Sequence, residues 1–186
     1  MDVRESLIRF MREGIKDERI PSVGLEAEHF ILRKSSGEAV SYAGEGGIRE
    51  ILSSLMEKTE GSEPLPGEEL LGFRSPDYSI TLEPAAQLEI SINASEDLAW
   101  IKGVYEEFLR LLRSVLEPYD YTCVAAATQP VSRVRELPLI PKERYRLMDR
   151  YFEGTGDGGV EMMRGTCSVQ ASIDYFSEED FQRKIQ

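Results

Sequence analysis

Three short segments of the chain alternate polar and apolar residues and place acids or amides at the polar positions. The segments are VGLEAEHFIL at 23–32, ITLEPAAQLEIS at 80–91 and TCSVQASIDY at 166–175. Because successive side chains of a β-strand point to opposite faces, residues two apart share a face. We therefore predict three strands, each with one polar and one apolar face.

The polar faces of these strands carry acidic, amide and hydroxyl side chains. They are Glu26 and Glu28 in the first segment, Glu83, Gln87 and Glu89 in the second, and Gln170, Ser172 and Asp174 in the third. The rise of a strand puts the Cα atoms of Glu26 and Glu28 about 7 Å apart. Carboxylates that face one another repel, and a cation such as Mg²⁺, which takes oxygen ligands and often carries phosphate, removes the repulsion. The same pattern also describes strands with a solvated face, so the pattern alone leaves both interpretations open.

The second segment has an interruption. Its apolar positions, Leu82, Leu88, Ile90 and Ile92, predict one buried face along a single strand. Pro84 cannot donate a hydrogen bond to a neighbouring strand, so we expect a bulge or an edge position there. Bulges often aim side chains into a functional site.

Apolar residues at helical spacing predict the remaining elements. We expect helices at about 2–18, 47–59, 95–117 and 141–152, further strands at about 70–73 and 121–128, and a short helix after Ser177. The connections are short and the order of elements is irregular. These features favour an α+β fold with a mainly antiparallel sheet and flanking helices.

Composition narrows the class of protein. The chain has 186 residues, 41% of them hydrophobic and 30% charged, and a formal net charge of −12. This charge argues against nucleic acid as a partner, and no apolar run reaches the roughly 20 residues of a membrane span. The two cysteines do not make a disulfide framework, so a cytoplasmic protein with reduced thiols is the expectation.

Other motifs are less informative. The segment 154–159 contains G-x-G-x-x-G, but it is predicted to follow a helix and precede a strand, which is not the context of a dinucleotide site.

The only histidine, His29, is predicted to point away from Glu26 and Glu28, which favours packing and argues against serine–histidine or cysteine–histidine chemistry. Cys123 and Cys167 are interpreted as buried, inert thiols.

The helix at 141–152 is strongly cationic. It carries Lys142, Arg144, Arg146 and Arg150. These side chains form a solvated face, or one arginine pairs with a substrate carboxylate or phosphate through its planar fork.

Four motifs give the chain a family resemblance. They are GLEAE at 24–28, ITLEPAAQLEIS at 80–91, RYRLM at 144–148 and MMRGTCSVQ at 162–170. In sequence, order and rough spacing they resemble the N-terminal half of the plant-type glutamate–cysteine ligases, a group that includes the related ergothioneine-pathway ligases. The resemblance extends over about 23–185.

The resemblance implies a fold like the catalytic sheet of glutamine synthetase, with Mg²⁺ and ATP held in a funnel of antiparallel strands. It implies that the γ-carboxyl of L-glutamate is activated as an acyl phosphate, which the amine of L-cysteine attacks. It implies four metal ligands, Glu26, Glu28, Glu83 and Glu89, and four substrate- or ATP-binding residues, Gln87, Arg144, Arg164 and Gln170. The acidic strands suit this chemistry, because phosphoryl transfer depends on positioning and charge neutralisation.

The chain departs from the family pattern at three places. Ala85 and Ala86 stand where the plant enzymes have two glycines. Gly165 stands where they have an arginine before the threonine, with Arg164 one position earlier. Ala27 replaces a histidine in the first acidic motif. We therefore expect the arginine contact to substrate to be moved or lost.

The family's catalytic domain is about twice as long as this chain. We expect residues 1–186 to be the N-terminal part of a single ligase domain and to have little ligase activity alone. Two alternatives stay open: a related carboxylate–amine ligase with another amine acceptor, and a non-catalytic binding module with a structural cation site. A homodimer also stays open.

Overall fold

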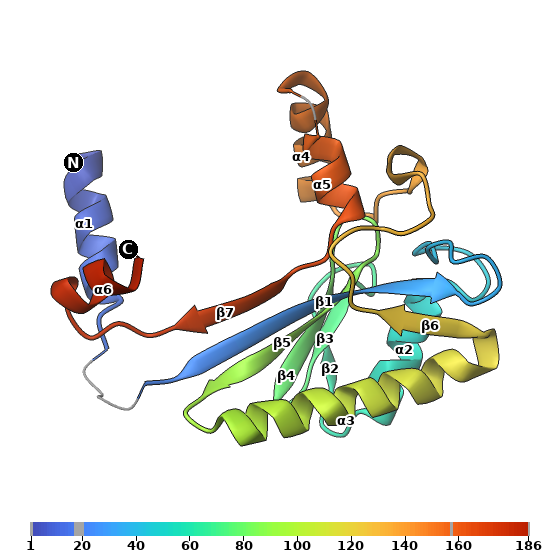
Figure 1. Ribbon diagram of the computed structural model, residues 1–186, viewed down its shortest axis with the longest axis horizontal. Helices are drawn as coiled ribbons and strands as arrows, with labels where there is room; N and C mark the ends of the chain where they lie inside the picture. The colour runs from blue at the N-terminus through green and yellow to red at the C-terminus, as the bar shows by residue number, and fades with distance from the viewer. Residues whose placement is uncertain (1, 17–20, 157, 186) are drawn as a thin grey trace.

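The computed structural model describes residues 2–16, 21–156 and 158–185, and it centres on a seven-stranded sheet (Figure 1). The strands are β1 Val23–Arg33, β2 Glu63–Pro64, β3 Gly72–Arg74, β4 Tyr78–Leu82, β5 Leu88–Ser95, β6 Tyr121–Val124 and β7 Val169–Ile173. Their order is β2-β3-β4-β5-β1-β6, and β7 pairs with β1. Every strand pair is antiparallel, which confirms the predicted α+β class and mainly antiparallel sheet.

Strand β1 is the centre of the sheet and has different neighbours along its length. Its first half lies between β5 and β7, and its second half pairs with β6. In this register Glu28 lies directly opposite Glu89 of β5, and Glu26 lies between Ser91 and Gln170. Residues opposite one another in an antiparallel pair point to the same face, so the register collects acids from two strands.

Helices α2 and α3 cover the face of the sheet opposite the acids. The helices of the described chain are α1 Val3–Glu13, α2 Ile48–Lys58, α3 Leu98–Leu116, α4 Glu143–Gly154, α5 Gly159–Gly165 and α6 Glu178–Ile185, with 3₁₀ turns at Glu117–Tyr119 and Val134–Glu136. The apolar stripes of α2 and α3 pack on the inward side chains of β1, β4 and β5, including Leu88 and Ile90. Asp97 caps α3 by accepting hydrogen bonds from the backbone N–H groups of Ala99 and Trp100.

The segment 80–91 is not one strand, as its alternation predicts, but a hairpin. Strand β4 ends at Leu82, β5 begins at Leu88, and the backbone N–H of Glu83 donates to the carbonyl of Gln87 across the turn. Ala86 adopts the left-handed conformation, with φ of 67°. Leu82 pairs with Leu88, so the apolar face stays continuous even though the chain reverses direction. Glu83 and Glu89 therefore come from opposite sides of a turn.

Two further segments differ from their predicted form. Gly154 ends α4 and Gly159 opens helix α5, where a strand is expected, so this glycine-rich segment follows a helix and the dinucleotide context is absent. Helix α1 ends at Glu13, and part of its predicted range lies outside the described residues.

Within the described ranges, no helix has the length and apolar character needed to cross a membrane.

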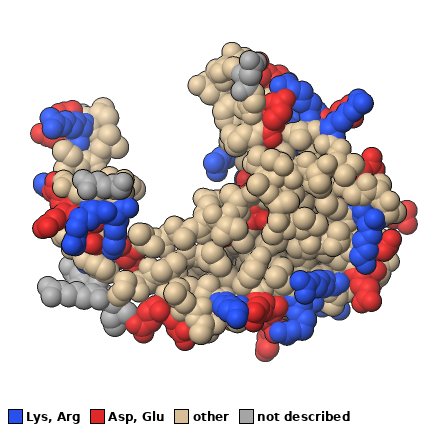
Figure 2. Space-filling view, in the orientation of Figure 1, with Lys and Arg blue, Asp and Glu red and all other residues tan. Residues whose placement is uncertain are grey.

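Two helical arms stand on the side of the sheet away from α3. One is formed by α1 and α6, where the Tyr175 hydroxyl donates to the carbonyl of Met11, and the other by α4 and α5 (Figure 1). Figure 2 shows a broad hollow between the arms, with charged residues on the arms and the outer rim and a largely uncharged floor. The sheet face that α2 and α3 leave uncovered faces this hollow.

Candidate functional site

Three carboxylates meet on the uncovered face of the sheet. Glu28 and Glu89 lie opposite each other on β1 and β5, and Glu83 follows β4 at the start of the turn. Burial raises the pKa of the Glu83 carboxyl, and the negative charges of Glu89 and Glu28 raise it further. The three acids are thus close enough to repel one another, as the polar pattern predicts, although Glu83 arrives by a turn.

Hydroxyl and amide groups hold two of these carboxylates. Glu28 accepts hydrogen bonds from the backbone N–H of Ser168 at 2.9 Å and from its hydroxyl at 2.8 Å. Glu89 accepts from the hydroxyls of Thr81 at 2.8 Å and Ser91 at 3.3 Å. Each acid is therefore oriented by neutral donors, which leave its charge uncompensated.

Helix α4 supplies the neighbours of Glu83. The hydroxyl of Tyr145 donates to Glu83 Oε1 at 3.2 Å, and the Lys142 ammonium lies 4.8 Å from the centre of the Tyr145 ring. Lys142 is close enough to counteract part of the upward pKa shift of Glu83. The pKa of Tyr145 is also raised, first by burial and then by the Glu83 charge.

Glu26 and Gln170 lie at the edge of the acidic group. They face each other across the β1–β7 pair, and both side chains are at least partly accessible. Gln170 Nε2 donates to Ser168 Oγ at 3.2 Å and approaches Glu28 Oε1 at 3.5 Å. The structure therefore brings Gln170 to the acids.

Gln87 has a different environment. Its side chain is only 2% exposed; its oxygen accepts from the backbone N–H of Ala85, and its amide nitrogen faces the carbonyls of Met163, Arg164 and Thr166 at 3.1–3.5 Å. These contacts tie the β4–β5 turn to the chain that leads into β7. Contact between Gln87 and a ligand stays a prediction.

The two predicted arginines are not equivalent. Arg164 forms a two-point ion pair with Asp149, at 2.9 and 2.5 Å, and its remaining nitrogen donates to the carbonyl of Leu137 at 2.8 Å. Its fork thus joins α5 to α4, and ligand binding by it stays a prediction. Arg144 is exposed on α4, 6.0 Å from the centre of the Tyr145 ring, on the helix that contacts Glu83.

Gly165 stands at the position where the family resemblance implies an arginine. A Cβ atom built on Gly165 would lie 2.6 Å from Val134 Cγ2, and the residue is buried. The backbone therefore packs too tightly here for an arginine in this conformation.

The acidic group suits a hard divalent cation by its chemistry. Its donors are carboxylate, hydroxyl and amide oxygens, which Mg²⁺ prefers, and no ion pair joins Glu26, Glu28, Glu83 or Glu89 to a cation within the described part of the chain. Among the described residues, no three acid, cysteine or histidine side chains are already placed to hold a metal ion. The donor set and its charge thus fit the ion, while a preformed cage is absent from those residues.

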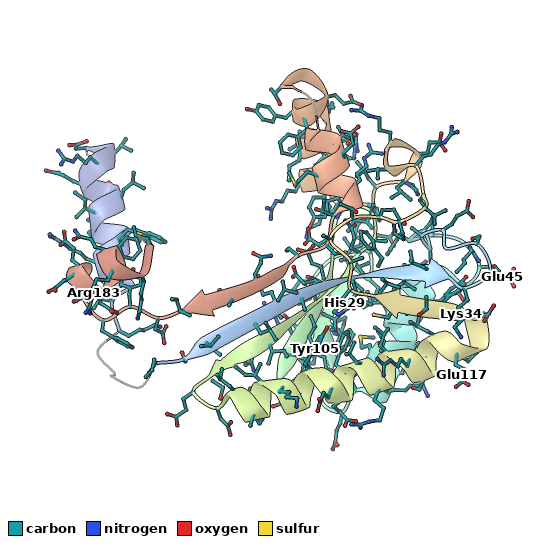
Figure 3. All side chains as sticks on the ribbon, viewed as in Figure 1. His29, Lys34, Glu45, Tyr105, Glu117 and Arg183 are labelled. Carbon is teal, nitrogen blue, oxygen red and sulfur yellow. The ribbon has the colours of Figure 1, made fainter. Side chains whose placement is uncertain are left out.

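The covered face holds the histidine and one of the two cysteines. His29 Nε2 lies 2.7 Å from the Tyr105 hydroxyl, and the two side chains point toward each other between β1 and α3 (Figure 3). Burial lowers the pKa of His29 and raises the pKa of Cys123 to about 12. Cys167 packs with Phe30 on the opposite face, and both cysteines are free. The predicted packing role of His29 and the inert thiols agree with this arrangement.

A cavity lies elsewhere in the molecule. It has a volume of about 760 Å³ and is lined by the start of α2 and by the segments around Tyr42, Glu69 and Pro138. The backbone N–H groups at the start of α2 already donate to the carbonyls of Ser41 and Tyr42. This cavity therefore offers no free anion-binding helix end.

Sequence reasoning did not assign Tyr145 or Ser168 to the acidic site. Tyr145 lies in the RYRLM motif beside Arg144, where it reads as an apolar helix position, and Ser168 lies at the start of the third polar segment. Alternation in 78–82 places Thr81 on the acidic face, but only the observed β4–β5 pairing places it beside Glu89.

Comparison with known proteins identifies relatives. Residues 22–186 match the model of glutamate–cysteine ligase family 2. The chain is 31% identical over 182 residues to the chloroplastic glutamate–cysteine ligase of Brassica juncea, covering 98% of this chain and 35% of that protein. The corresponding protein of Arabidopsis thaliana is 30% identical, with 98% and 34% covered, and glutamate–cysteine ligase A of Oryza sativa subsp. japonica is 29% identical, with 98% and 36% covered.

These comparisons set two limits on the sequence-based expectations. The chain spans about a third of the length of the curated relatives it matches. The expected cytoplasmic location is wrong by this comparison, because all three relatives are named as chloroplastic proteins. Reduced thiols do not distinguish one reducing compartment from another, so cysteine content was an insufficient guide.

Proposed function

Because the chain belongs to glutamate–cysteine ligase family 2, we propose that it forms the Mg²⁺·ATP-binding part of an enzyme that makes γ-glutamylcysteine, the first step of glutathione synthesis. Its substrates are L-glutamate, L-cysteine and ATP. The observation that carries the proposal is the meeting of Glu28, Glu83 and Glu89 on one open face, with the pKa of Glu83 raised by its acidic neighbours.

The proposed reaction has two steps. An oxygen of the γ-carboxylate of glutamate attacks the γ-phosphorus of ATP, so that a P–O bond to ADP breaks and a γ-glutamyl phosphate forms. The amine of cysteine then attacks the acyl carbon, the bond to phosphate breaks, and the amine loses a proton. The products are the γ-glutamyl amide, ADP and phosphate.

Glu26, Glu28, Glu83 and Glu89 are the proposed holders of Mg²⁺, which when bound neutralises phosphate charge. Ser168, Thr81 and Ser91 keep two of these acids oriented through the hydrogen bonds described above. Gln170 and Arg144 are the proposed polar contacts to substrate or phosphate, because Gln170 is exposed beside Glu28 and Arg144 is exposed beside Tyr145, which contacts Glu83.

Gln87 and Arg164 have a proposed supporting role in addition to any ligand contact. Their hydrogen bonds join the acidic turn, α4, α5 and the start of β7. We propose that the chain is the N-terminal part of one ligase domain with a glutamine-synthetase-like sheet, and that it has little ligase activity without the remainder of such a domain.

Two assays test this function. A longer polypeptide that contains this chain is incubated with ATP, Mg²⁺, L-glutamate and L-cysteine, and then with other amines in place of cysteine. We expect γ-glutamylcysteine and an equal amount of phosphate, both lost in Glu83→Gln. A product formed only with another amine would reassign the acceptor, and no phosphate release with any amine would overturn the ligase. Substantial γ-glutamylcysteine from the 186-residue chain alone would contradict its proposed incompleteness.

A further inference from the structure

Of the three central acids, Glu28, Glu83 and Glu89, only Glu83 lies outside a strand, so the backbone fixes the direction of its side chain least. It follows the last residue of β4 and opens the turn whose backbone hydrogen bonds run from Glu83 N–H to Gln87 and from Ala86 N–H to Glu83. Glu28 and Glu89, by contrast, are fixed on paired strands and receive hydroxyl donors from adjacent segments, Ser168 before β7 and Thr81 of β4. A carboxylate in a turn needs another group to set its direction.

Tyr145 supplies that group. Its side chain is 3% exposed, and its hydroxyl lies 3.2 Å from Glu83 Oε1 and 3.4 Å from the carbonyl oxygen of Leu82. One hydroxyl proton is thus shared between the carboxylate and the last carbonyl of β4. This links the direction of the Glu83 side chain to the backbone of the sheet.

The first turn of α4 holds Tyr145 in place. Its backbone N–H donates to the carbonyl of Lys142 at 3.0 Å, and the Lys142 ammonium lies over the ring at 4.8 Å. Among the described residues, no hydrogen bond is made to Glu83 Oε2, so the Tyr145 contact occupies one carboxylate oxygen and leaves the second for another partner.

We propose that Tyr145 is a positioning residue for the divalent-cation site, acting through Glu83; this inference rests on the proposed function. Groups that orient a metal ligand typically contribute about 10- to 100-fold to metal affinity. The contribution of Tyr145 is to keep the Glu83 carboxylate directed for the cation.

The experiment measures Mn²⁺ binding to the 186-residue chain from the loss of the free-ion electron paramagnetic resonance signal, with and without ATP. Tyr145→Phe removes one hydroxyl and keeps the ring. We expect it to weaken Mn²⁺ binding by about tenfold. Tyr105→Phe is the matched control, because it removes the hydroxyl that meets His29 on the covered face, and it is expected to leave Mn²⁺ affinity unchanged.

A double variant separates positioning from packing. If Tyr145 acts through Glu83, then Tyr145→Phe has no further effect on Mn²⁺ affinity in a Glu83→Gln background. Urea unfolding of each variant reports whether the fold is retained, and a packing role alone would change the urea midpoint while leaving the Mn²⁺ affinity of folded molecules at the wild-type value.

The outcomes distinguish this inference from the proposed function. If Glu83→Gln weakens Mn²⁺ binding but Tyr145→Phe does not, the positioning role of Tyr145 is overturned and the cation role of Glu83 is not. Equal losses from Tyr145→Phe in both backgrounds would also overturn the positioning role. Wild-type and Glu83→Gln chains that bind Mn²⁺ equally would overturn the cation role of Glu83 in the proposed function, and the positioning role with it.

Discussion

The two faces of strand β1 place polar side chains in opposite situations. On the covered face, His29 is 1% exposed, with one ring nitrogen near the Leu88 carbonyl and the other near the Tyr105 hydroxyl. On the open face, Glu28 lies opposite another acid and near a third. The side chains are neighbours along one strand, yet one has complementary partners and the other has like charges around it.

This difference separates a structural polar group from a functional candidate. A buried polar group that finds its hydrogen bonds within the fold needs no ligand. A group of carboxylates that costs free energy through mutual repulsion gains from a cation. The covered face therefore accounts for stability, and the open face is the place to look for binding.

The largest expected effect comes from the covered face. Phe108 of α3 is 1% exposed and packs against the rings of His29, Tyr78 and Tyr105. Phe108→Ala should lower the free energy of unfolding by about 3–5 kcal/mol, because it leaves a cavity under the sheet. Urea denaturation followed by circular dichroism measures the loss. A loss below about 1 kcal/mol would show that this face is not the core of the molecule.

An intermediate effect concerns pH and His29. Burial lowers the pKa of His29 in the folded chain, so below the ordinary value of about 6.5 the unfolded chain takes up a proton that the folded chain resists. The contribution of His29 is fully present above about pH 6.5 and is lost as the pH falls from that value toward the lowered pKa of the folded chain, with a slope no steeper than about 1.4 kcal/mol per pH unit.

The comparison for this effect is the His29→Gln chain, in which position 29 does not titrate. Acidic groups titrate in both chains, so they largely cancel when the unfolding free energies are subtracted at each pH. Urea unfolding from pH 7.5 to 5.5 should show the wild type losing stability relative to the variant. Parallel curves would mean that His29 is not buried as a neutral ring.

The smallest expected effect comes from the open face. Glu89→Gln removes one of two like charges that lie directly opposite each other, and should raise the free energy of unfolding by about 0.2–1 kcal/mol without added cation. The gain should shrink when Mg²⁺ is present, because the cation stabilises the wild type and not the variant. Glu45→Gln is the control, because it removes one negative charge from an exposed loop position. A destabilised Glu89→Gln chain would contradict the repulsion between Glu28 and Glu89.

Sequence patterns predict elements better than they predict the turn that completes the site. The alternation of 23–32 gives β1 and its two faces correctly, including the direction of His29. In 80–91 the apolar positions stay in phase through the reversal, because Leu82 and Leu88 pair directly. The Ala86 N–H donates to the Glu83 carbonyl, so Pro84 stands at the second position of the turn, where proline is common. Pro84 therefore marks the reversal, and the bulge or edge position expected for it is wrong. Ala86 adopts a left-handed conformation that glycine favours more.

The remaining contacts depend on residues distant in sequence. Gln87 and Arg164 both resemble ligand-binding residues from their motifs, but one is enclosed by carbonyls of the segment 163–166 and the other is paired with Asp149. Tyr145 reaches Glu83 across the packing of α4 on the acidic turn. These partners are set by tertiary packing, which the period of a single segment does not contain.

Titration calorimetry with Mg²⁺ tests the cation site most directly. The wild-type chain, Glu28→Gln and the Glu45→Gln control are titrated at the same pH and salt concentration. The proposed site predicts that Glu28→Gln binds Mg²⁺ at least about tenfold more weakly, a difference of about 1.4 kcal/mol, while Glu45→Gln matches the wild type. Equal affinities in all three chains would contradict the assignment of the open acidic face as a divalent-cation site.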